Sequence, residues 1–162
     1  NQLWLLIQRA GNGTNHLALA KEGDIINIIY PLGNGFTIDH QGKYLLIGGG
    51  VGIAPLLELG KVLKANGSHV TCQKGFVTMH TGLKSGDYDN IRVCGPGPMM
   101  KAVAKTVASW PENEKPNFCE VSLENKMACG LGVCLCCVEN TKDGHKCVCS
   151  EGPVFDIKDL NW

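Results

Sequence analysis

Hydrophobic and polar positions divide the chain into short apolar runs separated by glycine-rich and proline-rich turns. The first two runs, at 3–9 and 25–30, have the length of strands and predict buried strands. Between them we expect a turn at 11–15 and a short helix at 16–20, and turn-forming residues at 31–36 end this part. Two or three strands cannot close a barrel. We therefore expect this part to need partner strands that the printed sequence does not contain.

The middle of the chain alternates strand-length and helix-length patterns. Residues 43–47 (KYLLI) predict an apolar strand, as expected in a parallel sheet covered on both faces. Pro55 suits the first turn of the next helix, which leucines at helical spacing continue until Asn66 and Gly67 end it. Further along, we predict weak strands at 69–72 and 75–79, clear strands at 91–94 and 118–123, and a helix at 99–110. The alternation predicts an α/β domain with a parallel sheet at 41–124.

Beyond Glu124 the composition changes to cysteine and glycine. Cys129, Cys134 and Cys137 have the spacing C-x4-C-x2-C, and Cys149 follows on a later segment. This is the plant-type spacing for a [2Fe–2S] cluster. Thiolates are soft anionic ligands that suit iron–sulfur centres. The pattern therefore predicts a protein that moves electrons.

Two glycines and two further thiols bear on this loop. Gly130 and Gly132 accept positive φ and leave backbone N–H groups free to point at sulfur. Cys136 stands next to the third ligand candidate, and Cys147 stands close to the fourth. A structural zinc site with four thiolates is one alternative, although zinc knuckles usually hold two separate C-x2-C pairs. A disulfide-bonded module is another, although these cysteines crowd too densely for ordinary bridges.

The overall composition narrows the classes of function. The 162 residues carry 15 basic and 15 acidic side chains, which gives no electrostatic reason to expect nucleic acid or an anionic membrane as partner. Aromatic residues make up only 6%, so base-stacking platforms are not expected. No apolar run approaches the roughly 18 residues of a membrane span. Nine cysteines and no signal peptide predict a reducing compartment, the cytoplasm.

Two glycine-rich turns, at 48–55 and at 95–99, each follow a predicted strand and lead into a predicted helix. Such turns present the N–H groups of a helix N-terminus to a phosphate. A plain tight turn is the alternative for the first, because Ile53 departs from G-x-G-x-x-G. Cys94 is either a small core residue or a group facing a flat cofactor ring. Gly13–Thr14 is either a plain turn or a pyrophosphate contact. No acidic ribose-binding residue is evident, so NAD and NADP are not separated.

Several of these strings together resemble one family. GGGVGIAP, CGPGPMMKAV, CEVSLENKMACGLGVCLCC and CSEGPVF are similar to the electron-transfer subunit of the bacterial NAD-linked (type B) dihydroorotate dehydrogenase, in the ferredoxin-reductase superfamily. GNGT and YPLGNGF resemble the end of that family's FAD-binding barrel. The resemblance implies a remnant of an antiparallel FAD-binding barrel at 1–40, a ferredoxin-reductase-like α/β NAD-binding domain at 41–124 and a small [2Fe–2S] module at 125–162.

The resemblance also implies a role in pyrimidine (UMP) biosynthesis. Dihydroorotate would be oxidised on the FMN of a separate catalytic subunit, in a heterotetramer, and electrons would pass through the [2Fe–2S] cluster and FAD to NAD. No catalytic residue is assigned, because no Ser-His-Asp or paired-carboxylate arrangement is present and the cofactors carry the redox chemistry. The implied metal ligands are Cys129, Cys134, Cys137 and Cys149. The implied cofactor contacts are Gly13 and Thr14 for FAD, and Gly48, Gly49, Gly50, Gly52, Cys94, Gly95 and Pro96 for the dinucleotide.

The chain departs from the family pattern in two places. The Arg-x-x-Ser-type flavin motif is absent, which leaves FAD binding by this chain open. Family members also carry a longer stretch between the helix that ends near Asn66 and GFVT at 75–78, where only residues 67–74 stand here. We therefore expect that residues are missing before Asn1 and near Gly67.

Related functions stay open beside this one. A flavin and iron–sulfur subunit of a sulfide dehydrogenase, or a ferredoxin–NAD(P) oxidoreductase, would share every cofactor and differ in its partner. A ferredoxin-like carrier that binds no nucleotide is a further class, which the two phosphate-type turns disfavour. Leu131, Val133 and Leu135 either face a partner's flavin or pack the cysteine loop.

Overall fold

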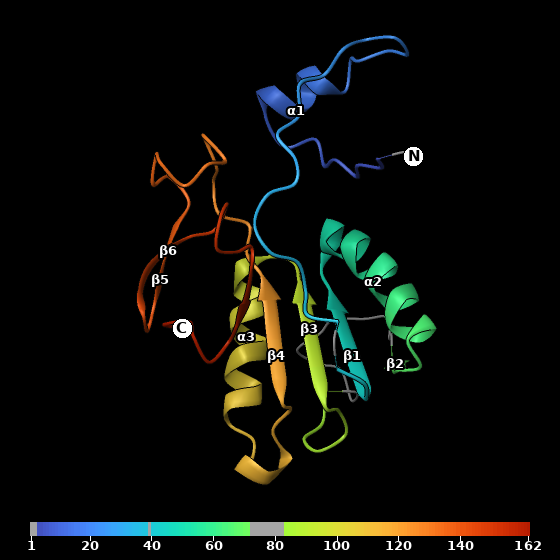
Figure 1. The fold of residues 1–162 in the computed structure, drawn as a ribbon, viewed down its shortest axis with the longest axis vertical. Helices are drawn as coiled ribbons and strands as arrows, with labels where there is room; N and C mark the ends of the chain where they lie inside the picture. The colour runs from blue at the N-terminus through green and yellow to red at the C-terminus, as the bar shows by residue number, and fades with distance from the viewer. Residues whose placement is uncertain (1–2, 39, 72–82) are drawn as a thin grey trace. The chain divides into compact units, whose positions relative to one another are not determined.

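The computed structural model describes residues 3–38, 40–71 and 83–162. The weak strand predicted at 75–79 lies outside these residues. By its contacts the chain divides into two compact units, Asn1–Pro31 and Leu32–Trp162 (Figure 1).

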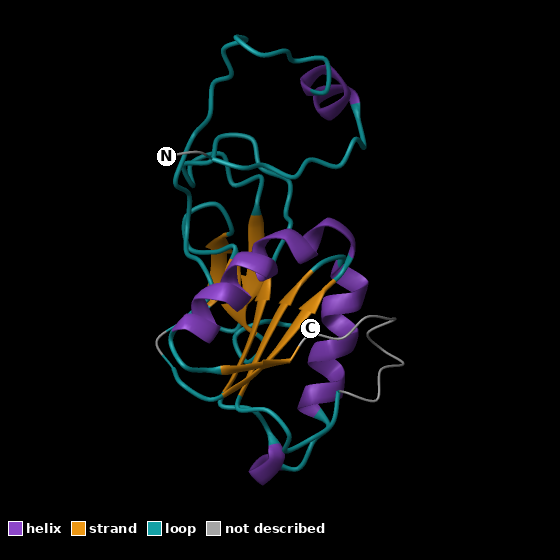
Figure 2. Cartoon of the chain, turned by 90° about the vertical axis from the view of Figure 1, so that its right-hand side faces the viewer, coloured by secondary structure: helices purple, strands orange, loops and turns teal. Residues whose placement is uncertain are grey.

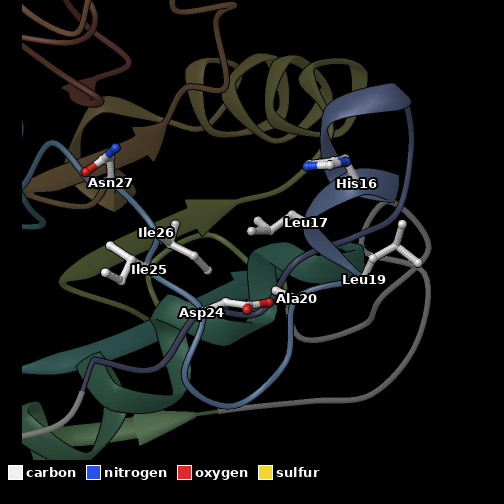
Figure 3. Close-up of a pocket in the computed structure, with 8 residues that line it drawn as sticks. All are labelled: His16, Leu17, Leu19, Ala20, Asp24, Ile25, Ile26 and Asn27. Atoms are coloured by element: carbon white, nitrogen blue, oxygen red, sulfur yellow. The ribbon is translucent and has the colours of Figure 1, made fainter.

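The first unit contains one short helix and long irregular segments. Helix α1 spans Asn12–Leu17 and buries none of its residues. The strands predicted at 3–9 and 25–30 are wrong, because both runs are irregular and exposed, with Ile25 at 93% exposure. A strand exists only through hydrogen bonds to a neighbour, and within residues 3–31 neither run pairs with a strand. Ile25 and Ile26 of the second run help to line an open hollow of about 490 Å³ beside His16 and Leu17 (Figure 3).

The second unit is built on a five-stranded sheet. In spatial order its strands are β2 (His69–Thr71), β1 (Lys43–Gly48), β3 (Asn90–Cys94), β4 (Phe118–Ser122) and β7 (Val154–Asp156). The first four are parallel, and β7 runs antiparallel to β4. Helix α2 (Ile53–Ala65) follows β1, and helix α3 (Gly97–Ala108) with a 3-10 turn (Glu112–Glu114) lies between β3 and β4. The predicted parallel α/β pattern is confirmed.

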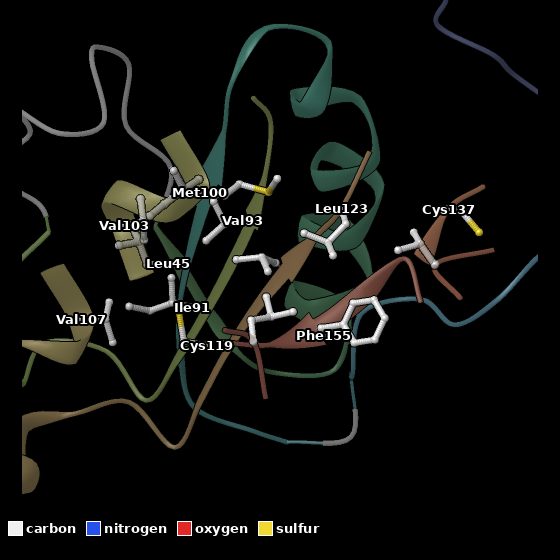
Figure 4. Close-up of a cluster of buried hydrophobic side chains, with 14 of the residues drawn as sticks. Leu45, Ile91, Val93, Met100, Val103, Val107, Cys119, Leu123, Cys137 and Phe155 are labelled. Carbon is white, nitrogen blue, oxygen red and sulfur yellow. The ribbon is translucent and has the colours of Figure 1, made fainter. Parts of the chain in front are cut away.

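The two helices cover opposite faces of this sheet (Figure 2). Successive strand residues point to opposite faces, so each strand contributes to two cores. The core under α3 joins Leu45, Ile47, Ile91, Val93, Cys119 and Val121 to Met100, Val103 and Val107 (Figure 4). The core under α2 joins Tyr44, Leu46 and Cys94 to Leu56, Leu59 and Leu63. The leucine spacing that predicted α2 therefore marks its buried face.

Residues 33–38, which we call the strap, are held to the sheet by a buried ion pair. Arg92 on β3 and Glu120 on β4 are register neighbours, with 2.9 Å between Nε and Oε2 and side-chain exposures of 0% and 9%. Glu120 accepts hydrogen bonds from the Thr37 backbone N–H (3.0 Å) and the Thr37 hydroxyl (2.6 Å). Nη2 of Arg92 donates to the Thr37 carbonyl at 3.1 Å. Thr37 of the strap therefore makes hydrogen bonds to both charged side chains.

The surroundings of Arg92 explain its electrostatics. Burial lowers the pKa of the Arg92 guanidinium, and the Glu120 carboxylate opposes this shift. The Nε–H of Arg92 is not directed at an acceptor, so the short Nε–Oε2 approach is electrostatic rather than a hydrogen bond. The ring of Tyr44 adds a cation–π contact at 5.2 Å. The positive charge of Arg92 is thus compensated by Glu120 on the neighbouring strand and by the Thr37 carbonyl of the strap.

The C-terminal cysteine segment packs onto the same sheet. Strands β5 (Val138–Thr141) and β6 (Gly144–Cys147) form an antiparallel hairpin. β7 then extends the large sheet, and the Leu123 N–H donates to the Pro153 carbonyl at 2.8 Å. Cys137 and Cys149 belong to the apolar cluster under α3. The cysteine segment is therefore continuous with the core of the α/β sheet.

Candidate functional site

The two glycine-rich turns meet at the carboxyl edge of the parallel sheet. Gly48 ends β1 beside Cys94 at the end of β3, and the Gly49 N–H donates to the Cys94 carbonyl at 2.9 Å. A Cβ on Gly52 would overlap the Cys94 carbonyl, and a Cβ on Gly95 would lie 2.9 Å from the Gly49 nitrogen. Only glycine permits this close approach of the two backbones. Ligands of open α/β sheets bind at this edge.

Each turn leads into the N-terminus of a helix. A 3-10 turn at Gly50–Gly52 precedes α2, and Pro96 precedes α3. Neither helix has an acidic residue in its first turn or a side-chain hydrogen bond at its N-cap. Helix N-termini attract phosphate groups through free N–H groups and the helix dipole. The edge is therefore equipped to hold a pyrophosphate.

Cys94 lies buried at this edge in the core under α2. Burial raises the pKa of the Cys94 thiol, the Ser122 hydroxyl opposes the shift through a hydrogen bond, and the Glu124 carboxylate adds to it. Ser122 is the register neighbour of Cys94 on β4. The Cys94 side chain packs in this core, at the end of the strand where the two glycine turns meet.

The cysteine loop is curled by residues with positive φ. Gly130 and Gly132 adopt φ of 70° and 77°, as their expected role requires. Leu135 adopts φ of 58°, the only described non-glycine residue with a positive φ. A β-carbon is strained in this region of backbone conformation, and such strain gathers at functional sites. Sequence reasoning missed Leu135, because nothing in a leucine indicates this conformation.

Backbone N–H groups point at three of the four predicted ligand sulfurs. The Leu131 N–H donates to Cys129 Sγ at 3.3 Å, the Gly132 N–H to Cys149 Sγ at 3.2 Å, and the Cys149 N–H to Cys137 Sγ at 3.4 Å. Such donors stabilise a thiolate. The Leu131 N–H, followed by the N–H and thiol of Cys134, lowers the pKa of Cys129 to about 6.

The predicted ligands are arranged as two pairs. Cys129 and Cys134 share a side-chain hydrogen bond, and so do Cys137 and Cys149. The Cys149 N–H is the main cause that lowers the pKa of Cys137, whereas the hydrogen bond with Cys137 is the main cause that raises the pKa of Cys149. Among the described residues, no three Cys, His, Asp or Glu side chains gather around one common ion position. Two cysteine pairs match the four cysteine ligands that a [2Fe–2S] centre takes.

The two additional thiols differ in their surroundings. Cys136 is exposed. Cys147 is buried, and burial followed by the charge of Cys137 raises its pKa. Its Sγ contacts the Gly132 carbonyl at 3.6 Å. Cys147 is therefore occupied as a donor to the backbone of the loop.

Three apolar side chains of the loop project into solvent. Leu131, Val133 and Leu135 are 65%, 77% and 64% exposed. They do not pack the loop, which removes that alternative. Exposed apolar side chains that lie together can serve as an interaction surface.

The predicted FAD contacts lie in the first unit. Gly13 and Thr14 belong to the first turn of α1 rather than to an open turn. The Thr14 hydroxyl accepts from the N–H groups of Ala10 (2.9 Å) and Gly11 (3.1 Å) and donates to the Gly11 carbonyl. In this structure the hydroxyl thus caps the helix.

Comparison with known proteins agrees with this picture. Residues 124–161 match the iron–sulfur cluster binding domain of dihydroorotate dehydrogenase B. The solved structure of an NADH-dependent reduced ferredoxin-NADP oxidoreductase, described in work on flavin-based electron bifurcation, superposes with a TM-score of 0.75 at 28% identity, over 96% of this chain and 67% of that chain. The fold and site therefore define an electron-transferring oxidoreductase of the ferredoxin-reductase type.

Curated relatives narrow the class to one family. The dihydroorotate dehydrogenase B (NAD(+)) electron transfer subunit of Caldanaerobacter subterraneus subsp. tengcongensis is 37% identical over 95% of this chain and 73% of its own length. The corresponding subunit of Clostridium perfringens is 34% identical over 96% and 74%. The chain belongs to the family of electron transfer subunits of NAD(+)-linked dihydroorotate dehydrogenase B. The resemblance noted from the sequence is confirmed.

The relatives also differ from this chain in length. The first alignment runs over 187 positions while covering 95% of the 162 residues, so that relative carries about 30 positions that the aligned part of this chain lacks. Within the described residues, no helix is long and apolar enough to cross a membrane.

Proposed function

We propose that this chain accepts electrons from an FMN-containing dihydroorotate dehydrogenase subunit and delivers them to NAD, with a [2Fe–2S] cluster and FAD as its own carriers. The proposal rests on the backbone N–H groups that donate to the sulfurs of the predicted ligands. The segment that carries these cysteines packs in the core of the sheet whose carboxyl edge suits a dinucleotide. When bound, the cluster supplies one-electron chemistry, and the flavin links it to hydride transfer at nicotinamide.

The cluster would be held by Cys129 and Cys134 as one pair and by Cys137 and Cys149 as the other. Cys149 is preferred to Cys147 because its sulfur receives the Gly132 N–H, whereas the Cys147 sulfur faces a carbonyl oxygen. An anionic ligand is stabilised by a donor and repelled by an acceptor. The N–H groups at these sulfurs would also raise the reduction potential.

The dinucleotide would lie across the carboxyl edge of the sheet. Gly48, Gly49, Gly50 and Gly52 would let its pyrophosphate approach the N-terminus of α2, and Cys94, Gly95 and Pro96 would lie beside the nicotinamide. FAD would contact Gly13 and Thr14, in the segment 1–40, which would form part of an antiparallel barrel in the full-length protein. The NAD-binding domain would span 41–124 and the cluster module 125–162.

Leu131, Val133 and Leu135 would contact the catalytic partner, because they surround the cluster ligands and are exposed. A heterotetramer in the cytoplasm, with two copies of each subunit, is the assembly that we propose. A ferredoxin–NAD(P) oxidoreductase is a second candidate, favoured by the 28% identity to the solved oxidoreductase.

Co-expression with a dihydroorotate dehydrogenase catalytic subunit tests the proposal. We expect the two chains to co-purify and to reduce NAD with dihydroorotate, and we expect Leu131→Glu to weaken co-purification. NADPH-dependent ferredoxin reduction without any response to dihydroorotate would favour the second candidate instead.

A further inference from the structure

Gly132 is held from both sides by the turn that carries the fourth predicted ligand. Its N–H donates to Cys149 Sγ at 3.2 Å, and its carbonyl accepts from Cys147 Sγ at 3.6 Å. Its φ of 77° suits glycine, and a Cβ there would lie 3.0 Å from the Ser150 hydroxyl. The loop and the turn therefore meet at a single residue with little freedom to shift.

The turn itself is rigid. The Cys147 N–H donates to a Glu151 carboxylate oxygen at 2.7 Å. The Cys147 carbonyl accepts from the N–H groups of Ser150 (3.1 Å) and Glu151 (2.8 Å). Asn34 of the strap donates to the Glu151 carbonyl at 3.2 Å. Cys147 is thus fixed by backbone and side-chain contacts, and its thiol has a defined direction toward the loop.

We propose that Cys147 is a positioning residue for the iron–sulfur centre, whose thiol holds the Gly132 carbonyl so that the Gly132 N–H stays directed at the Cys149 sulfur. The proposal rests on the proposed function, since it presumes that Cys149 is a cluster ligand. Hydrogen bonds to ligand sulfurs favour the reduced, more negative state and so raise the potential. Groups that orient a ligand from outside the coordination sphere tune a metal site in the same way.

Loss of the thiol should weaken this N–H···S bond without removing a ligand. In Cys147→Ala we expect the cluster to remain and its preference for the reduced state to fall about threefold. At 59 mV per tenfold change for one electron, this is a potential about 30 mV more negative. A thiol is a weak donor, so Cys147→Ser, which keeps a hydroxyl donor, should lie closer to wild type than Cys147→Ala.

The experiment is a potentiometric titration of the anaerobically purified full chain, followed by EPR of the reduced centre, for wild type, Cys147→Ala, Cys147→Ser and Cys136→Ala. The Cys136 variant is the matched control, because it removes an exposed thiol of the same loop. We expect Cys136→Ala to keep the wild-type potential and EPR line shape, and Cys147→Ala to shift both.

Each other outcome overturns the inference in a recognisable way. Equal potentials for Cys147→Ala and wild type, or equal shifts in the Ala and Ser variants, would show that the thiol does not position the loop. Loss of iron and acid-labile sulfide in both Cys147 variants, with retention in Cys149→Ala, would make Cys147 a ligand. A wild-type chain without an iron–sulfur centre would instead refute the proposed function itself.

Discussion

Neutralising Glu120 should strongly lower the free energy of unfolding of the α/β sheet. In Glu120→Gln the shape of the side chain remains, but Arg92, which is 0% exposed, loses its countercharge. Removing one partner of a buried ion pair costs about 3–5 kcal/mol. Native proteins are stable by only about 5–15 kcal/mol, so the variant should lose a large part of its free energy of unfolding.

Replacing both charges should recover much of this loss. Buried ion pairs exchanged for apolar side chains of similar volume are often neutral in stability. In Arg92→Met/Glu120→Leu, however, the Thr37 N–H and hydroxyl lose their acceptors. Each unsatisfied buried donor costs about 1–3 kcal/mol, so we expect the double variant to remain less stable than wild type.

Anaerobic urea unfolding, followed by far-ultraviolet circular dichroism, measures these differences. The matched control is Glu58→Gln, because Glu58 pairs with Lys61 at 3.0 Å while both side chains are more than 70% exposed. We expect that control to change the free energy of unfolding by less than about 0.5 kcal/mol. If Glu120→Gln loses no more stability than Glu58→Gln, or if Arg92→Met/Glu120→Leu loses more than Glu120→Gln, the reasoning from the buried ion pair is refuted.

Two further predictions concern the glycine turns and a buried thiol. Gly52→Ala should weaken NADH binding about tenfold or more, equivalent to roughly 1.4 kcal/mol, because its Cβ would overlap the Cys94 carbonyl. Gly97→Ala has open space around the new Cβ and should bind NADH as wild type does in a fluorescence titration. Equal NADH affinities of the two variants would contradict a dinucleotide site at this edge of the sheet. Burial raises the pKa of Cys119 to about 12 in the folded chain, whereas the pKa of a free cysteine is about 8.5. The stability that the buried neutral thiol contributes is therefore complete below about pH 8.5 and is lost as the pH rises toward 12. Mass spectrometry after alkylation at pH 8 should find Cys119 unmodified in the folded chain and modified in urea, and modification of the folded chain would refute its burial.

The α/β part could be read from the sequence because its pattern and its packing agree. The apolar runs at 43–47 and 91–94 are central strands with neighbours on both sides, so local pattern and tertiary pairing favour the same structure. The runs at 3–9 and 25–30 look equally apolar. They form no strand, because no neighbour pairs with them within the described part of the first unit.

The ion pair that holds the strap was not predicted, although the sequence contains a signal for it. Arg92 and Glu120 are single charges inside otherwise apolar strands, IRVC and FCEVS, and opposite charges at matching places in adjacent strands indicate a buried pair. The partner Thr37 could not have been found, because the strap lies 55 and 83 residues away in the chain. The cysteine spacing predicts a set of cluster ligands, but the N–H donors to sulfur depend on backbone conformation, which spacing does not specify.

The account depends most directly on what the cysteines hold. Iron and acid-labile sulfide should be measured on the anaerobically purified full chain, together with low-temperature EPR after dithionite reduction, in wild type and Cys149→Ser. We predict two irons and two sulfides per wild-type chain with the signal of a reduced [2Fe–2S] centre, and loss or strong alteration of that signal in the variant. A wild-type chain that carries zinc, no labile sulfide and no EPR signal would contradict the account.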